Sequence, residues 1–524
     1  MSQPVTYLQK ASHRLTLAHL VIGVALVFVA SNFLFALSLR WLPGAVLGLG
    51  CLAAALIIIR EVRKNDFLST PVHLPFFALC MATGFTLCLL GGQGHIFYSA
   101  DDWVIRDAVL ADMSTSALPA YGWNGETWIL RAPLGMYLLP GALGRLAGLG
   151  YAHALMFLQN ASLTGLALYL IAEAFGRRTL GFLAIFVFFS GLDFFGQIKS
   201  FGLQWTDLYP EVWHPFFAYM SFINQLFWAP NHALPGWCFA ALLALHLRGG
   251  GLAPTLLVFF AATVLWSPLA MMGALPFLIF IVLREPRKML SPEVIRACLA
   301  GAAFLPVAVY LQADATRIPS GWMPGGEEFL GFYFLSIGLE VPHIIFVLAP
   351  AFQRQKPFSG ALVLTIVLLC VIPFYALGLS NDFAMRASIV PLAVLAACFA
   401  CRVPDLGQLK DPFRFAAWAV IAISAWTPIM EIMRNTKLPA FTISSCDLVS
   451  SWREISNPGD PGLDHYMARL DRAPSWLLAP PQTLPPRVRG KASCWPDHPL
   501  HMPPAAPIVN GALHQVPSQT RSQA

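Results

Sequence analysis

The stretch 17–39 reads LAHLVIGVALVFVASNFLFALSL and contains no Asp, Glu, Lys or Arg. An α-helix needs about 20 apolar residues to cross the ~30 Å hydrocarbon layer of a bilayer, so this stretch is long enough to span a membrane. It is too long for the core of a signal peptide, and no convincing cleavage site follows it. We therefore predict that it is a retained first membrane span.

The rest of the chain has the same character. Of its 524 residues, 57% are hydrophobic and 11% are charged, whereas soluble domains carry about 25% charged residues. This composition excludes a soluble globular enzyme and predicts an all-α polytopic membrane protein. Apolar periodicity and length predict about thirteen transmembrane helices, near residues 17–39, 41–59, 73–92, 152–175, 179–196, 232–248, 252–267, 269–284, 295–311, 329–350, 359–378, 387–401 and 413–430.

The distribution of Lys and Arg predicts the orientation. The net charge of +6 comes from small basic groups between apolar stretches rather than one patch, so no nucleic-acid partner is expected. With the N-terminus in the cytosol, seventeen cations face the cytosol and seven face outside before residue 435, in agreement with the positive-inside rule. This count treats 133–148, which contains Pro140 and Arg145, as a helix lying in the interface. We predict a multi-pass membrane protein with its N-terminus in the cytosol and its C-terminus outside.

Two regions follow from this topology. Residues 1–434 form the transmembrane domain, and residues 435–524 form an external, proline-rich and partly disordered tail with an ordered stretch around 450–478. The tail holds fourteen of the 41 prolines and few apolar runs, so it cannot bury a sizeable core. The large external loops of the transmembrane domain are predicted at about 93–151, 197–231 and 312–328.

The cysteines fit the same division. Eight of the ten lie in apolar stretches, with no CxxC pair or His-rich partner typical of a zinc site. Cys446 and Cys494 are the two outside those stretches, and both fall in an oxidising compartment if the tail is external. We predict that they form a disulfide.

The first candidate site opens the first large external loop. The sequence 99–112 reads SADDWVIRDAVLAD, with two adjacent carboxylates, Asp101 and Asp102, at a membrane surface. Neighbouring acids repel each other, which raises the pKa of one of them and suits a proton acceptor. The alternative is a helix start, with Ser99 as N-cap and Asp102 completing a capping box, which leaves Asp101 unexplained.

A second polar group lies between the fifth and sixth predicted spans. It includes Asp193, Lys199, Asp207 and His214 among several tryptophans. Acids and aromatic rings together are typical of sugar binding, because rings stack on C–H surfaces and carboxylates accept hydroxyl hydrogen bonds. For the tryptophans, an aromatic belt at the headgroup level is the competing interpretation.

The third candidate is Arg386, in a short external turn between two apolar spans. A guanidinium at the interface suits a lipid-linked phosphate, which it can bind in bidentate fashion. The alternatives are an ion pair with Asp382 at i, i+4 and an arginine that snorkels to lipid headgroups.

The order of these pieces resembles the GT-C superfamily of integral membrane glycosyltransferases, and within it bacterial members of the protein mannosyltransferase and aminoarabinose transferase type. The resemblance covers about 100 of the 524 residues. Two spans precede the one that leads to the acidic loop, where the family usually has one, and Asp102 stands where Glu is common. The corresponding pieces here are Asp101-Asp102, residues 103–113, 131–150 and 152–175, Arg177-Arg178, and residues 179–197.

The resemblance implies transfer of a sugar from a polyprenyl-phosphate carrier to a glycan, lipid or protein acceptor on the external face. Asp101 would be the general base, with Asp102 in support, because an acceptor hydroxyl must lose its proton. On side and charge alone, Arg386 would neutralise the phosphate, with Lys199 or Arg131 as weaker choices. The cofactor stays undetermined; Asp193 or Asp207 would orient the acceptor or a divalent cation.

The rival class is a transporter or flippase of lipid-linked saccharides. Such proteins carry intramembrane charges and broken helices. The candidates for intramembrane charge are Glu340 and His343, and a polar contact between helices explains them as well.

Overall fold

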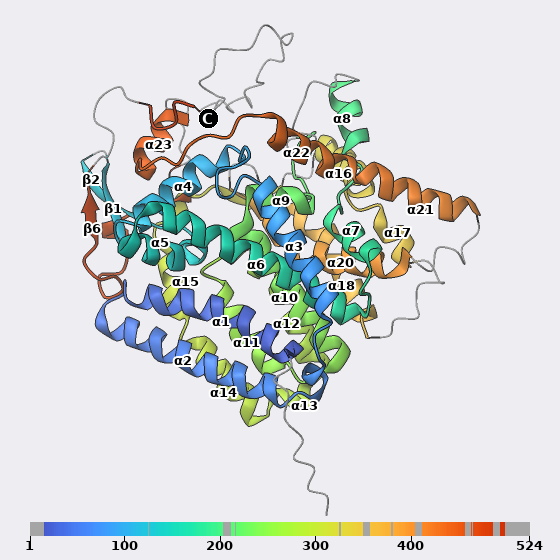
Figure 1. Ribbon diagram of the computed structural model, residues 1–524, viewed down its shortest axis with the longest axis horizontal. Coiled ribbons are helices and arrows are strands. Elements are labelled where there is room, and N and C mark those ends of the chain that lie inside the picture. The colour runs from blue at the N-terminus through green and yellow to red at the C-terminus, as the bar shows by residue number, and fades with distance from the viewer. Residues whose placement is uncertain are drawn as a thin grey trace, which may run out of the picture.

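Helices dominate the structure, as the composition predicts, and two small sheets accompany them (Figure 1). The computed structural model describes residues 15–123, 125–202, 211–214, 216–323, 326–348, 357–378, 381–403, 411–455, 463, 465–485 and 493–497.

Local signals set the ends of helices in the first half of the chain. Gly176 adopts a left-handed φ of 67° and ends α6, because a residue without Cβ takes that conformation freely. The Thr179 side chain accepts the N–H of Phe182 and starts α7. The helices are α1 (Leu17–Ala36), α2 (Trp41–Arg63), η1 (Asp66–Ser69), α3 (Leu74–Leu90), α4 (Asp102–Met113), α5 (Gly135–Ala147), α6 (Leu149–Phe175), α7 (Leu180–Val187), α8 (Asp193–Phe201), α9 (Phe222–Trp228) and α10 (Pro230–Gly249).

Proline opens several helices of the second half, where its missing N–H leaves no bond unmade. Ser267 caps α12 by accepting the N–H of Ala270 at 3.1 Å. The helices are α11 (Ala253–Thr263), α12 (Pro268–Arg284), α13 (Pro286–Met289), α14 (Pro292–Ala302), α15 (Leu305–Gln312), η2 (Ala315–Arg317), α16 (Glu327–Glu340), α17 (His343–Leu348), α18 (Ser359–Val371), η4 (Ile372–Phe374), α19 (Asp382–Ala387), α20 (Ile389–Arg402), α21 (Asp411–Ser424), α22 (Trp426–Lys437), α23 (Leu448–Ile455) and η7 (Leu470–Arg472).

Five helices among the described residues are long and apolar enough to cross a membrane, which supports membrane association. Six further apolar helices of 10–17 residues accompany them. The described residues therefore do not contain thirteen helices that are each long enough to span a membrane. The five are Leu17–Ala36, Trp41–Arg63, Leu149–Phe175, Pro292–Gln312 and Pro412–Lys437, of which the fourth joins α14 to α15 and the fifth joins α21 to α22.

The range 179–196, which the sequence predicts as one span, contains a break. Helix α7 ends at Val187, and α8 begins at Asp193. Between them the N–H of Leu192 donates to the carbonyl of Leu339 at 2.7 Å. A Cβ on Gly191 would meet Cα of Glu340 at 2.9 Å. The close approach of α16 therefore takes over a backbone hydrogen bond that a continuous helix would make internally.

Helix α5 lies where the sequence predicts an interfacial helix, and it packs between α4 and α6. Helix α6 also packs closely along α3, where a Cβ on Gly84 would meet the carbonyl oxygen of Ala161 at 2.6 Å. Small residues let helix backbones approach this closely in membrane proteins. Helix α6 therefore contacts both α3 and α5, and α5 in turn contacts α4.

The four-stranded sheet has no counterpart in the sequence-based expectation. A hairpin in the predicted first external loop, β1 (Pro119–Trp123) and β2 (Glu126–Leu130), forms its centre. The tail adds β5 (Met467–Arg469) antiparallel to β2 and β6 (Gln482–Leu484) parallel to β1. Figure 1 shows this sheet at one edge of the molecule, beside α4, α5 and α23. The described part of the tail therefore packs on the hairpin of β1 and β2.

A second, two-stranded sheet joins β3 (Ser320–Trp322) to β4 (Tyr375–Leu377) in antiparallel register. It brings the end of the segment after α15 next to the turn that precedes α19.

The predicted disulfide between Cys446 and Cys494 is confirmed: the two cysteines are joined across 48 positions of sequence. Glu454 of α23 also holds the segment around Cys494. Its carboxylate accepts the backbone N–H of Cys494 at 2.5 Å and that of Trp495 at 3.1 Å. The disulfide thus fastens the segment 493–497 to α23.

Loss of this disulfide should loosen the tail. In a chain-entropy model a loop of this length contributes ~3–4 kcal/mol, so Cys446→Ser should make residues after 446 sensitive to limited proteolysis. Cys298→Ser, which removes an exposed free thiol, is the matched control and should leave the digestion pattern unchanged. Peptide mapping without reductant should recover Cys446 and Cys494 as one linked species. Two freely alkylated thiols in folded wild-type protein would contradict the link.

Candidate functional site

A cavity of about 280 Å³ lies where the start of α4, the segment before α9, α9 itself and the α19–α20 junction meet. Its wall combines acids, amides and one guanidinium with apolar side chains. The lining residues are Asp102, Glu211, Val212, Met220, Asn224, Gln225, Trp228, Ala229, Asp382, Met385, Arg386 and Ile389.

Asp102 is placed at this wall by an ion pair within its own helix. It is the first residue of α4, and its Oδ2 lies 3.0 Å from the guanidinium of Arg106, one turn further on. The capping box expected from Ser99 does not form, because α4 begins at Asp102 and Asp101 makes no capping bond from its side chain. The carboxylate of Asp102 reaches forward to Arg106 instead of back to the chain before the helix.

Arg106 and Trp103 dock α4 on the end of α9. Arg106 donates to the carbonyl of Trp228 at 2.8 Å and to Oδ1 of Asn231 at 2.9 Å. The indole N–H of Trp103 donates to the carbonyl of Phe227 at 2.6 Å. Carbonyls at a helix C-terminus lack partners within the helix, so these two side chains satisfy them. The position of Asp102 relative to α9 is therefore fixed by buried hydrogen bonds.

Asp101 has a different environment. Its Oδ1 accepts the hydroxyl of Tyr98 at 2.5 Å, and among the described residues it is not part of the cavity wall. The ring of Tyr98 in turn faces the guanidinium of Arg434 at 5.8 Å from its centroid. The two neighbouring acids thus point into different surroundings, as expected for adjacent residues at a helix start.

Arg386 lines the cavity and also forms the ion pair expected as an alternative. Its Nη2 lies 3.1 Å from Oδ1 of Asp382. Helix α19 is anchored by Asn381, whose Oδ1 accepts the N–H of Ala384 at 3.3 Å and whose Nδ2 donates to the carbonyl of Phe216 at 2.9 Å. Asp102 and Arg386, far apart in sequence, therefore face the same cavity.

A group of buried acids adjoins the cavity at Glu211. The Oε1 of Glu211 accepts the N–H of Ser221 at 2.6 Å. Asp193 accepts hydroxyl hydrogen bonds at 3.0 Å from both Ser190 and Thr427. Burial, with added repulsion from Asp193, raises the pKa of Glu211 well above its usual value. Asp193 contributes to this buried group and does not line the cavity itself.

The other predicted residues lie apart from the cavity wall. His214 is buried, with Nε2 at 2.7 Å from the Ser336 hydroxyl, and burial lowers its pKa to about 4, so the ring is neutral at pH 7. Arg131 is buried directly after β2, and its backbone N–H donates to the carbonyl of Tyr466 at 2.6 Å. Lys199 is exposed on α8. Asp207 lies outside the described residues.

The sequence analysis missed several residues that the structure brings together. Asn224 and Gln225 line the cavity from α9; they carry no charge, and nothing in their spacing marked them. A group of His95, Asp107 and His153 is a second example: their ligand atoms lie within 4.8 Å of one another. Asp107 belongs to the same quoted stretch as Asp101, but its partners come from segments on either side that no sequence motif connects.

The cavity can hold a polar group between an acid that accepts a proton and a guanidinium that binds an anion. The apolar part of its wall, Trp228 and Met385 among others, can cover a ring or a lipid segment. Comparison with protein-family models, with curated proteins and with solved structures finds no match for the chain.

The raised pKa of Glu211 predicts a pH dependence of stability. The folded protein keeps this proton at pH values where the unfolded chain, with a glutamate pKa of about 4.3, has released it. Stability should therefore fall as pH rises from about 4.3 through the folded pKa. Glu211→Gln, which cannot ionise, should show a smaller loss of Tm over that range.

The measurement is thermal unfolding of the purified protein in detergent across the pH series. Glu126→Gln is the matched control, because Glu126 is an exposed glutamate in β2, and its Tm profile should follow that of the wild type. Equal pH slopes for Glu211→Gln and wild type would show that Glu211 is already ionised in the folded protein.

Proposed function

We propose that the chain is a GT-C-like membrane glycosyltransferase that transfers a sugar from a polyprenyl-phosphate donor to an acceptor on the extracytoplasmic face. The observation that carries this proposal is the single cavity lined by both Asp102 and Arg386. An acid and a guanidinium at one cavity are the two groups that displacement of a phosphate from an anomeric carbon requires. The partners are the carrier-linked sugar, membrane lipid and a glycan, lipid or protein acceptor, with no nucleic acid.

The topology proposed with this function is about thirteen crossings of the bacterial inner membrane, with the N-terminus in the cytosol and the C-terminus outside. Two short helices in succession, such as α16 and α17 on either side of Pro342, would together make one crossing. The sheet formed by the tail with the first external loop supports a common side for both segments. The Cys446–Cys494 disulfide supports an oxidising compartment on that side.

The cavity suits the head of the donor rather than the whole lipid. Its volume of about 280 Å³ is slightly below that of typical ligand pockets, ~300–1,000 Å³. A sugar phosphate would occupy it, with the indole of Trp228 as a face for the sugar ring, while the polyprenyl chain would extend into lipid.

In the proposed reaction, Asp102 and Arg386 each have one role. The acceptor hydroxyl oxygen attacks the anomeric carbon, and its proton passes to the carboxylate of Asp102. The bond from the anomeric carbon to the phosphate oxygen breaks, and its electron pair leaves with the phosphate, whose charge Arg386 neutralises. We assign the base to Asp102 in preference to Asp101, because Asp102 lines the cavity and Asp101 accepts the Tyr98 hydroxyl.

One observation favours transport of a lipid-linked saccharide instead. The buried acids Asp193, Glu211 and Glu340 lie next to the cavity, and buried carboxyl groups in membrane proteins often carry protons or ions. A transporter would bind the same donor without breaking its glycosidic bond, so bond cleavage separates the two functions.

Removal of the proposed base should abolish transfer while folding is kept. Loss of a positioned base typically lowers the rate ~10²–10⁴-fold. Asp102→Asn should show a loss of this size, and Asp101→Asn a smaller one. The assay uses purified protein in nanodiscs, polyprenyl-phosphate donors carrying radiolabelled mannose, glucose or arabinose, and total membrane extract as acceptor. Wild-type turnover by folded Asp102→Asn would contradict the base assignment, and donor binding without cleavage by the wild type would favour transport.

Arg386 should govern donor affinity. A hydrogen bond to a charged group contributes ~1.5–3 kcal/mol, so Arg386→Ala should weaken inhibition by undecaprenyl phosphate about tenfold or more. Arg386→Lys keeps the charge without the planar fork and should lose less. Arg317→Ala, another cation of the predicted external side, is the control. Unchanged inhibition with Arg386→Ala would remove the phosphate role.

A further inference from the structure

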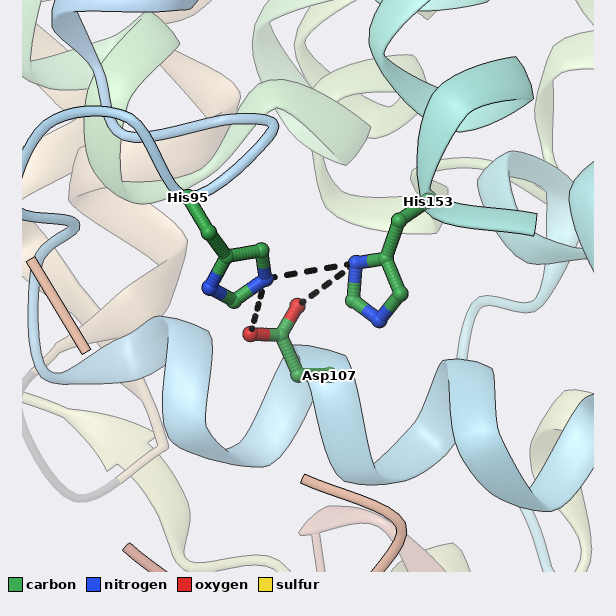
Figure 2. A group of neighbouring side chains, drawn as sticks. All are labelled: His95, Asp107 and His153. Carbon is green, nitrogen blue, oxygen red and sulfur yellow. Dashed lines mark hydrogen bonds and ion pairs between the residues drawn. The ribbon is translucent and has the colours of Figure 1, made fainter. Parts of the chain in front are cut away.

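His95, Asp107 and His153 approach one another from three separate elements (Figure 2). His95 lies in the segment between α3 and α4, Asp107 in the middle of α4, and His153 in the first turns of α6. Asp107 is completely buried, the exposed fraction of His153 is 4%, and that of the His95 side chain is 10%. The group is therefore almost closed to solvent and separate from the cavity wall.

His95 is held in an unusual backbone conformation. Its φ of 60° is left-handed, which few non-glycine residues adopt, and two glycines with positive φ precede it at positions 92 and 94. Such conformations persist where the surrounding structure holds them, and they cluster at functional sites. Here the conformation turns the His95 ring inward, toward Asp107 and His153.

One hydrogen bond decides the protonation of His95. Its Nδ1 lies 2.9 Å from the carbonyl oxygen of Phe441, which can only accept, so Nδ1 carries the proton. In a neutral ring Nε2 then presents a lone pair. The Nε2 atom lies 3.3 Å from Oδ2 of Asp107 and 3.3 Å from Nδ1 of His153.

The carboxylate of Asp107 needs a positive charge at this position. Neither of its oxygens receives a well-directed hydrogen bond from a described residue. A proton shared between the two imidazoles would leave this buried carboxylate negative and unsatisfied, which is costly in an apolar interior. The charge of this group can be balanced by a proton, on a histidine or on Asp107 itself, or by a metal ion.

The distances match a shared metal ion. Zinc bonds of ~2.0–2.1 Å to imidazole nitrogen and carboxylate oxygen, at tetrahedral angles, place neighbouring ligand atoms about 3.3 Å apart. Nε2 of His95 lies 3.3 Å from Nδ1 of His153 and 3.3 Å from Oδ2 of Asp107. Nδ1 of His153 lies 3.8 Å from the other carboxylate oxygen, Oδ1, so each oxygen of Asp107 is near one of the two imidazoles. The bond from Nδ1–H of His95 to Phe441 supplies the outer hydrogen bond that metal-binding histidines usually make.

We propose that His95, Asp107 and His153 bind one divalent transition-metal ion, zinc above all, through Nε2, an Oδ and Nδ1 respectively. Two imidazoles and one carboxylate suit Zn²⁺ and not the hard, oxygen-binding Mg²⁺ or Ca²⁺. The ion connects α4 and α6 with the segment before α4 and, through Phe441, with the chain after α22. It holds in place the segment that leads into Asp101 and Asp102.

The test measures metal binding directly and does not depend on the proposed function. Full-length protein in nanodiscs is stripped with EDTA and then titrated with Zn²⁺, with metal content measured by mass spectrometry. The wild type should bind one ion per chain. Asp107→Asn, which keeps the shape of the side chain, and His153→Gln should each weaken binding by at least about tenfold. His246→Gln, which removes a buried histidine whose Nδ1 accepts the N–H of Leu252, is the control and should bind normally.

Co²⁺ gives a second measurement on the wild type alone, should a variant fail to fold. Bound Co²⁺ should give the strong visible bands of a four-coordinate nitrogen and oxygen site, and Zn²⁺ should displace it. No stoichiometric ion in the wild type, a Co²⁺ spectrum without such bands, or unchanged affinity in folded Asp107→Asn would overturn the site and leave a proton as the balancing charge of the group.

Discussion

Arg106 is the interaction on which the arrangement of the cavity depends. Its guanidinium is buried in an apolar protein, where it pairs with Asp102 of the same helix and donates to the carbonyl of Trp228 and to Oδ1 of Asn231. The last two bonds tie α4 to the end of α9 and the start of α10. A buried guanidinium is stable only when its donors are satisfied, so these partners cannot separate without a large cost. One buried charge thereby fixes the position of Asp102 and closes the end of α9.

Helix α4 carries two different chemistries on two faces. Asp102 and Arg106 face the cavity and α9, whereas Asp107 meets the histidines of the neighbouring segments. Asp102 and Asp107 are five positions apart, which places them on different sides of a helix. The proposed metal ion would steady the same helix that presents the proposed base, so the position of the base would depend on contacts on both sides of α4.

Sequence patterns predicted what depends on composition and local chemistry. The apolar stretches predicted most helix positions, and the two cysteines outside them predicted the disulfide. The i, i+4 spacing of Asp382 and Arg386 offered their ion pair as an alternative to phosphate binding, and the pair is present. What the patterns missed depends on contacts between distant segments. The strands β5 and β6 are only three residues each and exist because the hairpin β1–β2 offers them partners. The histidines His95 and His153 and the amides of α9 likewise come next to their partners only in the folded chain, so no sequence pattern indicates them.

The central claim is that the cavity receives the phosphate end of a polyprenyl carrier. The most direct measurement is a cryo-electron microscopy structure of the full chain in nanodiscs with undecaprenyl phosphate. The account predicts phosphate density in the cavity, at ~2.7–3.2 Å from the guanidinium of Arg386, with Asp102 facing the open side of the phosphate and the lipid chain leaving toward the bilayer. Carrier density that binds elsewhere on the protein, with this cavity empty, would contradict it.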